Sequence, residues 1–232
     1  MKGPSVAVAL EASGPPGSAA ASAGEASAEI SLGTSAAHGR GLLPALRECL
    51  SRVGARPGEI GLVVVGTGPG SYTGLRVAIA AAKAIAFARG CPIVSLPSAE
   101  AIAAQAPPGE ARVAVAIDAK RGEVFASLHE RVGAAIVCRA APRLLPAESL
   151  VHLAPGALVV GDGALLHARL LRESGLRVGG EEVARPRAGV LLHLGLLAFA
   201  ERGGEPLASV QPLYLRPPAA EEKRARSPSP PA

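Results

Sequence analysis

The chain has 232 residues, of which 49% are hydrophobic, and its formal net charge is +5. No segment reaches the roughly 20 consecutive apolar residues of a membrane-spanning helix, and the apolar run Val6–Leu10 is too short for a signal peptide. The positive charge forms no strong basic block. With no tryptophan, three phenylalanines and two tyrosines for stacking on bases, autonomous RNA binding is not expected.

The first predicted elements are a three-strand meander followed by a helix. The strand Val6–Leu10 leads into a turn at 11–14, and residues 18–23 and 28–32 are two further strand candidates. A helix is predicted over 41–53 because apolar residues recur there at helical spacing. Its apolar face consists of Leu42, Leu46, Leu50 and Val53, with Leu43 beside them.

A glycine-rich turn then joins the predicted strand Leu62–Val65 to a long helix, Thr73–Arg89, which precedes a strand over 93–96. Strand, turn, helix and strand make a βαβ unit, the seed of a parallel or mixed sheet. The turn is built from glycine, proline and hydroxyl residues: Gly66, Gly68, Pro69, Gly70, Ser71 and Thr73.

The spacing within this turn fits none of three known glycine motifs. A P-loop requires a second glycine five residues after the first, and a dinucleotide fingerprint requires a third glycine at a fixed spacing. A nucleophile elbow requires glycine where Pro69 stands. Two interpretations stay open: a structural turn with Ser71 or Thr73 as the helix N-cap, or an anion site at the helix N-terminus.

Small residues recur every four positions along the helix Thr73–Arg89, at Gly74, Ala78, Ala82 and Ala86. Such a stripe lets a second helix approach closely, because no long side chain holds the two backbones apart. An alanine-rich helix is also simply a stable one, so this interpretation stays open as well. The remaining positions are mostly apolar, which indicates burial on more than one side, with the sheet on one side and a partner on another.

The second half follows a short helix, 98–105, and a proline-glycine segment, 106–109, which is the predicted hinge. A hairpin over 112–129 is expected to turn through 118–122. The later elements are predicted as strand 135–138, helix 146–153, strand 157–160, a helix ending at Glu173, and helix 188–201.

The histidines of the sequence do not have the spacing of metal ligands. The five histidines, at 38, 129, 152, 167 and 193, include no two that lie three to five residues apart, so no metal is expected. No Ser-His-Asp order is signalled either. Cys49, Cys91 and Cys138 are odd in number and far apart, which favours unpaired thiols and a cytoplasmic protein.

The segment 66–103 resembles the hallmark segment of the bacterial TsaB (YeaZ) family, the partner proteins of TsaD in making threonylcarbamoyladenosine on transfer RNA. The likeness continues through most of the chain, at His38 with Leu42-Leu43-Pro44, at 116–124, at 161–163 and at Tyr214-Leu215-Arg216. It implies an α/β fold of the actin, Hsp70 and sugar-kinase (ASKHA) type, with two related subdomains and mixed sheets.

On this basis we expect one subdomain over 1–106 and a second over 107–217, whose last helix is free to pack back on the first. Residues 218–232, which end in serine and proline with nothing apolar to pack, are expected to be a disordered tail.

The resemblance also identifies candidates for phosphate binding. The first phosphate loop of the superfamily corresponds to Glu11-Ala12-Ser13, where TsaB proteins commonly have Asp-Thr-Ser, and Asp118 matches the second. The longer acid and the missing threonine hydroxyl count against a working site. Glu11, Ser13 and Asp118 are therefore weak nucleotide candidates, and a turn-initiating role is favoured for Asp118.

Functionally, the resemblance implies a non-catalytic subunit that binds TsaD as a heterodimer, with the ATPase TsaE joining the complex and transfer RNA contacted only indirectly. TsaD-type proteins carry a histidine pair for their metal, which this chain lacks, as TsaB proteins do. The resemblance implies no cofactor held by the chain itself, and it leaves room for ATP or ADP at a complex interface and for a homodimer of the isolated chain. The expected interface lies on the helices 41–53 and 73–89, at Leu42, Leu43, Leu46, Leu50, Tyr72, Gly74, Ala78, Ala82 and Ala86.

A second hypothesis is an independent nucleotide-binding ATPase or kinase of the same superfamily. It would use Glu11, Ser13 and Asp118 around the nucleotide. The altered first phosphate loop is the sequence feature that separates the two hypotheses.

Overall fold

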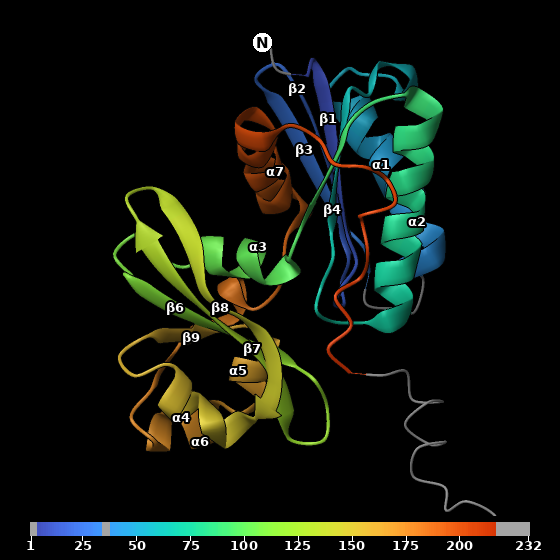
Figure 1. Cartoon of the computed structure of the whole chain (residues 1–232). Coiled ribbons are helices and arrows are strands. Elements are labelled where there is room, and N and C mark those ends of the chain that lie inside the picture. The colour runs from blue at the N-terminus through green and yellow to red at the C-terminus, as the bar shows by residue number, and fades with distance from the viewer. Residues whose placement is uncertain (1–3, 34–37, 217–232) are drawn as a thin grey trace, which may run out of the picture.

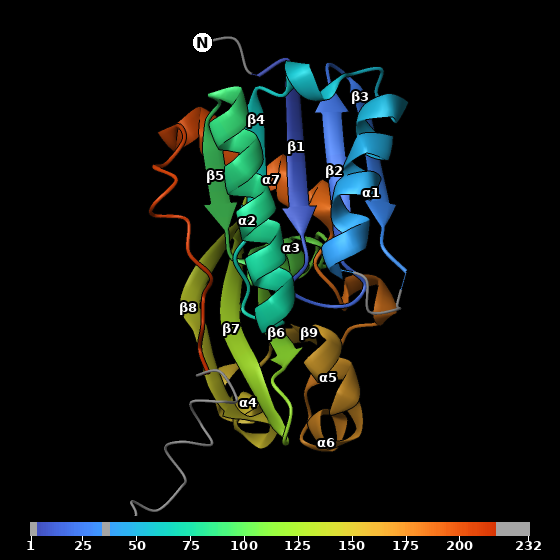
Figure 2. The ribbon, with the colours of Figure 1, turned by 90° about the vertical axis from the view of Figure 1, so that its right-hand side faces the viewer.

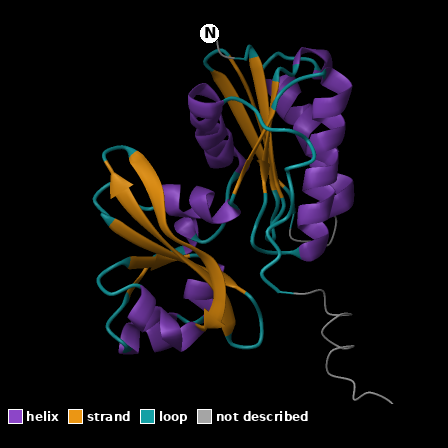
Figure 3. Ribbon diagram, viewed as in Figure 1, coloured by secondary structure: helices purple, strands orange, loops and turns teal. Residues whose placement is uncertain are grey.

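The computed structural model describes residues 4–33 and 38–216, which form two lobes, each built on a five-stranded mixed sheet (Figure 1; Figure 3). The predicted α/β fold with two mixed sheets is confirmed. The predicted tail, 218–232, lies outside the described residues, as does the side chain of His38. Among the described helices, none is both long enough and apolar enough to cross a membrane.

The sheet of the first lobe has the strand order β3-β2-β1-β4-β5. Its strands are β1 (Val6–Glu11), β2 (Ser18–Ala23), β3 (Ala26–Ser31), β4 (Leu62–Gly66) and β5 (Ile93–Leu96). The first three are antiparallel neighbours, as expected of a meander, whereas β4 runs parallel to both β1 and β5. The helix between β4 and β5 therefore makes the predicted βαβ crossover.

Helices cover both faces of this sheet, because the central strands are apolar on both sides. On one face, α1 (His38–Arg52) and α2 (Tyr72–Arg89) pack on Val8 and Val63, and Figure 2 shows the two helices side by side in front of the strands. On the other face, α7 (Ala188–Arg202) packs on Ala9 and Val64. The last helix of the chain thus lies on the first lobe.

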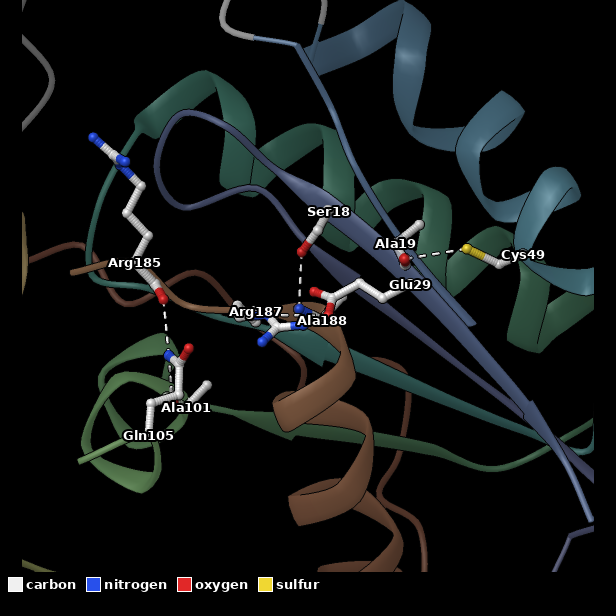
Figure 4. A network of polar contacts seen from close by, with 9 residues as sticks. All are labelled: Ser18, Ala19, Glu29, Cys49, Ala101, Gln105, Arg185, Arg187 and Ala188. Carbon is white, nitrogen blue, oxygen red and sulfur yellow. Dashed lines mark hydrogen bonds and ion pairs between the residues drawn. The ribbon is translucent and has the colours of Figure 1, made fainter. Parts of the chain in front are cut away.

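Polar contacts hold the start of α7 against the first sheet (Figure 4). The Ala188 backbone N–H donates to Ser18 Oγ at 2.8 Å, and the Arg187 guanidinium lies 2.7 Å from Glu29 Oε2. On the opposite face, the buried Cys49 thiol donates to the Ala19 carbonyl at 3.2 Å. These contacts fix the start of α7 on one face of the first sheet and α1 on the other.

The sheet of the second lobe has the order β10-β9-β6-β7-β8. Its strands are β6 (Arg112–Asp118), β7 (Glu123–Val132), β8 (Ala135–Pro146), β9 (Leu158–Val160) and β10 (Arg177–Val178). One face is covered by α4 (Leu150–Leu153), α5 (Asp162–Leu166) and α6 (Ala168–Glu173). Two single 3-10 turns, η2 (Ala147–Ser149) and η3 (Glu181–Val183), flank these elements, and a third, η1 (Pro57–Glu59), precedes β4.

The short helix α3 (Ser98–Ala104) lies between the lobes (Figure 1). Ala101 packs with α7 in the first lobe, whereas Ile102 packs with Val115 and Phe125 of the second sheet. Both faces of this helix are therefore buried, one against each lobe.

Three predictions for the second lobe were wrong in extent. The strand predicted over 135–138 continues to Pro146, because β8 is an edge strand and Pro142 falls at a bulge, where no ladder N–H is required. The single helix predicted to end at Glu173 is broken at His167 into α5 and α6. The helix predicted over 146–153 is a 3-10 turn followed by one helical turn.

Candidate partner surface and interlobe cleft

The glycine turn is packed against the end of the first hairpin, which explains its composition. A Cβ added at Gly70 would lie 2.1 Å from the Ser13 carbonyl oxygen, and one at Gly74 would lie 1.9 Å from that of Ala12. No side chain fits at either distance, so only glycine lets the two backbones approach this closely. Gly68 has a φ of 97°, a conformation that favours glycine for a second reason.

Several backbone donors of this turn are used inside the protein. The Ser71 N–H donates to the Ser13 carbonyl at 2.6 Å, and the Gly68 N–H donates to Ser98 Oγ at 3.0 Å. Ser71 Oγ accepts from the Gly74 N–H at 3.2 Å, so Ser71, one of the two predicted candidates, is the N-cap of α2. Of the two interpretations of the turn, the geometry supports the structural one over the anion site.

Glu11, one of the weak nucleotide candidates, is a buried residue whose carboxylate is held by hydrogen bonds within the protein. Its side chain is 1% exposed, with Oε1 accepting from the Ser13 N–H at 2.6 Å and Oε2 accepting from Ser98 Oγ at 2.7 Å. Burial raises the pKa of this carboxyl, although the hydrogen bonds from Ser13 and Ser98 oppose the shift. Glu11 Oε2 also occupies the space that a Cβ at Gly66 would need, 1.9 Å away.

Ser13 and Asp118, the other two candidates, both line a cavity of about 460 Å³ between the lobes. Asp118 is the last residue of β6, and its Oδ1 accepts from the Lys120 N–H at 2.7 Å while Oδ2 pairs with the Lys120 ammonium. Partial burial alone would raise the pKa of Asp118, but the hydrogen bonds from Lys120 outweigh it and hold the pKa below its ordinary value. The Asp118 backbone N–H donates to Asp162 Oδ1 at 2.9 Å. The bonds to Lys120 mean that the Asp118 carboxylate initiates the turn and is already paired.

Most of the predicted partner interface is buried within the chain itself, and that part of the prediction was wrong. Seven of its residues pack on the first sheet or the adjoining turn: Leu42, Leu46, Leu50, Gly74, Ala78, Ala82 and Ala86. Small residues are needed there because the long helix α2 lies close against a β-branched sheet surface. Helical periodicity identifies such a stripe, but it does not say whether a sheet or a partner covers it.

The outer face of α1 and α2 has a different composition. Of the predicted interface residues, Leu43 and Tyr72 are exposed, with fractions of 47% and 37%, but Tyr72 lines the interlobe cavity and stacks on Tyr214. Phe87 is 79% exposed, and small residues on the same helix are exposed with it: Ala80, Ala84 and Ala88. We call the set of Leu43, Ala80, Ala84, Phe87 and Ala88 the outer helix face. The sequence signal that could have identified Phe87 was the nearly all-apolar composition of its helix. Such a helix has too few polar residues to cover a whole solvent-facing side, so apolar side chains are left on its outer face.

The described residues hold no group of three or more histidine, cysteine, aspartate or glutamate side chains arranged to bind a metal ion. Ser127 Oγ and His129 Nε2 lie 2.9 Å apart, but each residue is only 1% exposed. No substrate reaches this pair, so it is a core contact.

Two lobes with the same sheet topology, joined across a cleft, define an ASKHA-type fold, the superfamily of actin, Hsp70 and the sugar kinases. Residues 32–162 match the family model "TsaD: tRNA N6-adenosine threonylcarbamoyltransferase". The structure of YeaZ from Pseudomonas aeruginosa superposes with a TM-score of 0.79 at 25% identity, covering 91% of this chain and 100% of that one.

Among curated relatives, the tRNA threonylcarbamoyladenosine biosynthesis protein TsaB of Escherichia coli K12 is 30% identical over 186 residues, covering 77% of this chain and 80% of the relative. The TsaB protein of Bacillus subtilis 168 is 33% identical over 88 residues, 38% of each chain. This chain belongs to the TsaB (YeaZ) family.

Proposed function

We propose that this chain is a non-catalytic subunit of the apparatus that makes N6-threonylcarbamoyladenosine at position 37 of transfer RNA in the cytoplasm. Its relatives from E. coli and B. subtilis are named for this biosynthesis. In the proposal, a TsaD-type transferase is the direct partner and performs the group transfer. The ATPase TsaE joins the pair, and transfer RNA is contacted indirectly.

The observation that carries the proposal is the exposed phenylalanine of the outer helix face. Phe87 is 79% exposed, which is unusual for the largest apolar side chain of a helix whose other face is fully buried. Aromatic side chains that are buried at the centre of a contact contribute much of its binding energy. The alanines around Phe87 leave room for two partner helices to approach, so the helices 41–53 and 73–89 keep their proposed role through their opposite faces.

The arrangement at the first hairpin supports a subunit without its own catalysis. A phosphate loop binds its ligand through free backbone N–H groups, whereas those of Ser13, Gly68 and Ser71 donate inside the protein. The carboxylate of Glu11, which would serve a metal-bound nucleotide, is buried among the same groups. We therefore propose no cofactor held by this chain alone, and we place any nucleotide at the contact with the partner.

The test replaces Phe87 and measures binding to the TsaD protein of the same organism by titration calorimetry. Phe87→Ser should weaken binding by about 2 kcal/mol, or roughly thirtyfold, because an aromatic anchor is lost. Leu166→Ser is the matched control, since Leu166 is also strongly exposed, at 64%, but lies on α5 of the second lobe. Its binding should match the unmodified chain.

Equal losses in the two variants would reject the outer helix face as the binding surface. If the isolated chain forms a homodimer, light scattering should show that Phe87→Ser weakens it too, because the same surface would serve both contacts. ATP turnover by the chain alone that disappears in Asp118→Ala would favour the independent enzyme instead.

A further inference from the structure

The segment after α7, residues 205–216, begins on the first lobe. Glu205 pairs with Ile93 at the edge of β5, and the Glu205 carboxylate accepts from the Ser95 N–H at 2.6 Å. Further along, Val210 is fully buried in the first-lobe core. The Leu213 N–H then donates to the Thr67 carbonyl at 2.8 Å, beside the glycine turn. Figure 2 shows this segment descending past β5 toward the second lobe.

The last described residues of the segment contact both lobes. Tyr214 stacks on Tyr72 of α2, with ring centroids 4.6 Å apart and an interplanar angle of 22°. One residue later, Leu215 packs with the apolar cluster of the second lobe. The Arg216 guanidinium donates to the Ala119 carbonyl and to the Glu123 carboxylate. Ala119 lies in the turn after β6, and Glu123 is the first residue of β7. The chain therefore crosses from one lobe to the other between Tyr214 and Leu215.

Within residues 38–216, the two other crossings between the lobes lie together. One runs from α3 to β6, and the other from η3 to α7. The Gln105 side chain donates to the Ala101 carbonyl at 3.0 Å and to the Arg185 carbonyl at 2.8 Å, which ties the first crossing to the second (Figure 4). Two connections bound to each other act as a single hinge, about which two lobes are free to rotate.

The third crossing is far from this hinge. The hinge enters the second lobe at Arg112, the start of β6, whereas Arg216 is attached beyond Asp118, the end of the same strand. Seven residues of strand separate these points by about 20 Å. The interlobe cavity lies between the two attachments, with Arg185 among its lining on the hinge side and Tyr214 on the other.

We propose that residues 205–216 form a clasp that holds the two lobes at one angle and prevents the interlobe cleft from opening. A body attached to another at one hinge rotates, whereas a second attachment about 20 Å away removes that rotation. The bonds of the clasp to the second lobe are few: the side chain of Leu215 and the contacts of Arg216. Breaking them frees the hinge while the buried Val210 still anchors the segment to the first lobe.

The test measures the distance between the lobes in the full chain by pulsed electron spin resonance. Spin labels are attached at Ser51→Cys on α1 and Arg172→Cys on α6, both at exposed positions, in a background carrying Cys91→Ser and Cys138→Ser. The unmodified clasp should give one narrow distance distribution. The double variant Leu215→Ala with Arg216→Ala should give a broader distribution that extends to longer distances. Gln211→Ala is the control, because among the described residues the Gln211 side chain donates to the Ala208 carbonyl, which lies within the same segment.

A second variant, Glu123→Gln, weakens the clasp from the second lobe without changing the segment itself. It should raise the hydrogen-exchange rate of the Leu213 amide roughly five- to tenfold, as expected when one local interaction is weakened. A double variant that melts earlier but keeps the narrow distribution would overturn the proposal, because the contacts would then be purely stabilising. If the double variant does not fold, unchanged exchange at Leu213 in Glu123→Gln overturns it.

Discussion

The two lobes have the same sheet topology but use corresponding positions differently. The order β3-β2-β1-β4-β5 of the first lobe recurs as β8-β7-β6-β9-β10 in the second, with the same parallel and antiparallel pairings. Glu11 ends β1, and Asp118 ends β6 at the equivalent point. Glu11 is buried and linked to Ser98, whereas Asp118 lines the cleft and pairs with Lys120. A shared topology therefore does not carry a shared role for the residue at the strand end.

The helices that follow the two glycine turns show the same divergence. The first turn opens into the 18-residue helix α2, whose buried stripe is made of small residues. The corresponding turn of the second lobe, with Gly161 and Gly163, opens into α5, which ends after five residues. A long, closely packed helix offers its outer face to a partner, and a short one offers little surface. The comparison explains why we place the partner on the first lobe.

The largest effect that would sharpen this comparison is expected at the two turns. A Cβ at Gly74 would lie 1.9 Å from the Ala12 carbonyl oxygen, whereas at Gly163 the nearest atoms are 2.9 Å away. Gly74→Ala should therefore cost about 3 kcal/mol or more of unfolding free energy, and Gly163→Ala about 1–2 kcal/mol. Thermal melts should show a drop of roughly 10 °C for the first and about half of that for the second.

Gly109→Ala is the control for both variants, because nothing lies within 4 Å of the added methyl group. Equal melting temperatures for Gly74→Ala and Gly163→Ala would mean that the starts of α2 and α5 tolerate an added methyl group equally. The contrast between the lobes would then be lost at this level.

The sequence predicted the local structure well where local signals are strong. The helix start after the glycine turn and its N-cap Ser71, one of the two predicted candidates, are local features, and both are present in the structure. The alanine stripe of the same helix was misassigned, because periodicity gives the width of a buried face and not its neighbour. The burial of Glu11 could not be predicted for a related reason, since its partner Ser98 is 87 residues away.

The second effect separates the lobes by their response to acid. Burial lowers the pKa of His129, in the second lobe, from 6.5 to about 4. The neutral side chain is therefore favoured in the folded state, and its stabilising contribution is complete above pH 6.5 and is lost as the pH falls to 4. The loss should reach about 3 kcal/mol.

Glu11 of the first lobe has the opposite sign. Its pKa is raised by burial, so acid relieves the cost of a buried carboxylate, and stability is gained as the pH falls through the folded-state pKa. Melts of the unmodified chain and of His129→Gln, compared at neutral pH and near pH 4, isolate the histidine. The difference between the two proteins should change with pH, and parallel curves would rule out His129 as the acid-sensitive group of the second lobe.

The smallest effect concerns the charge of Asp118. Its Oδ1 accepts the Lys120 N–H within a turn where Lys120 and Arg121 both have positive φ, 65° and 59°. Because an Asp side chain stabilises such a turn as an acceptor, Asp118→Ala should cost about 1 kcal/mol. Asp118→Asn keeps an acceptor oxygen and loses only a pair with the largely exposed Lys120, so it should cost less than about 0.5 kcal/mol. Chemical denaturation of both variants measures the difference. If Asp118→Asn were as damaging as Asp118→Ala, the negative charge itself would be required at the cleft, and Asp118 would then be closer in role to a phosphate-loop carboxylate than Glu11 is.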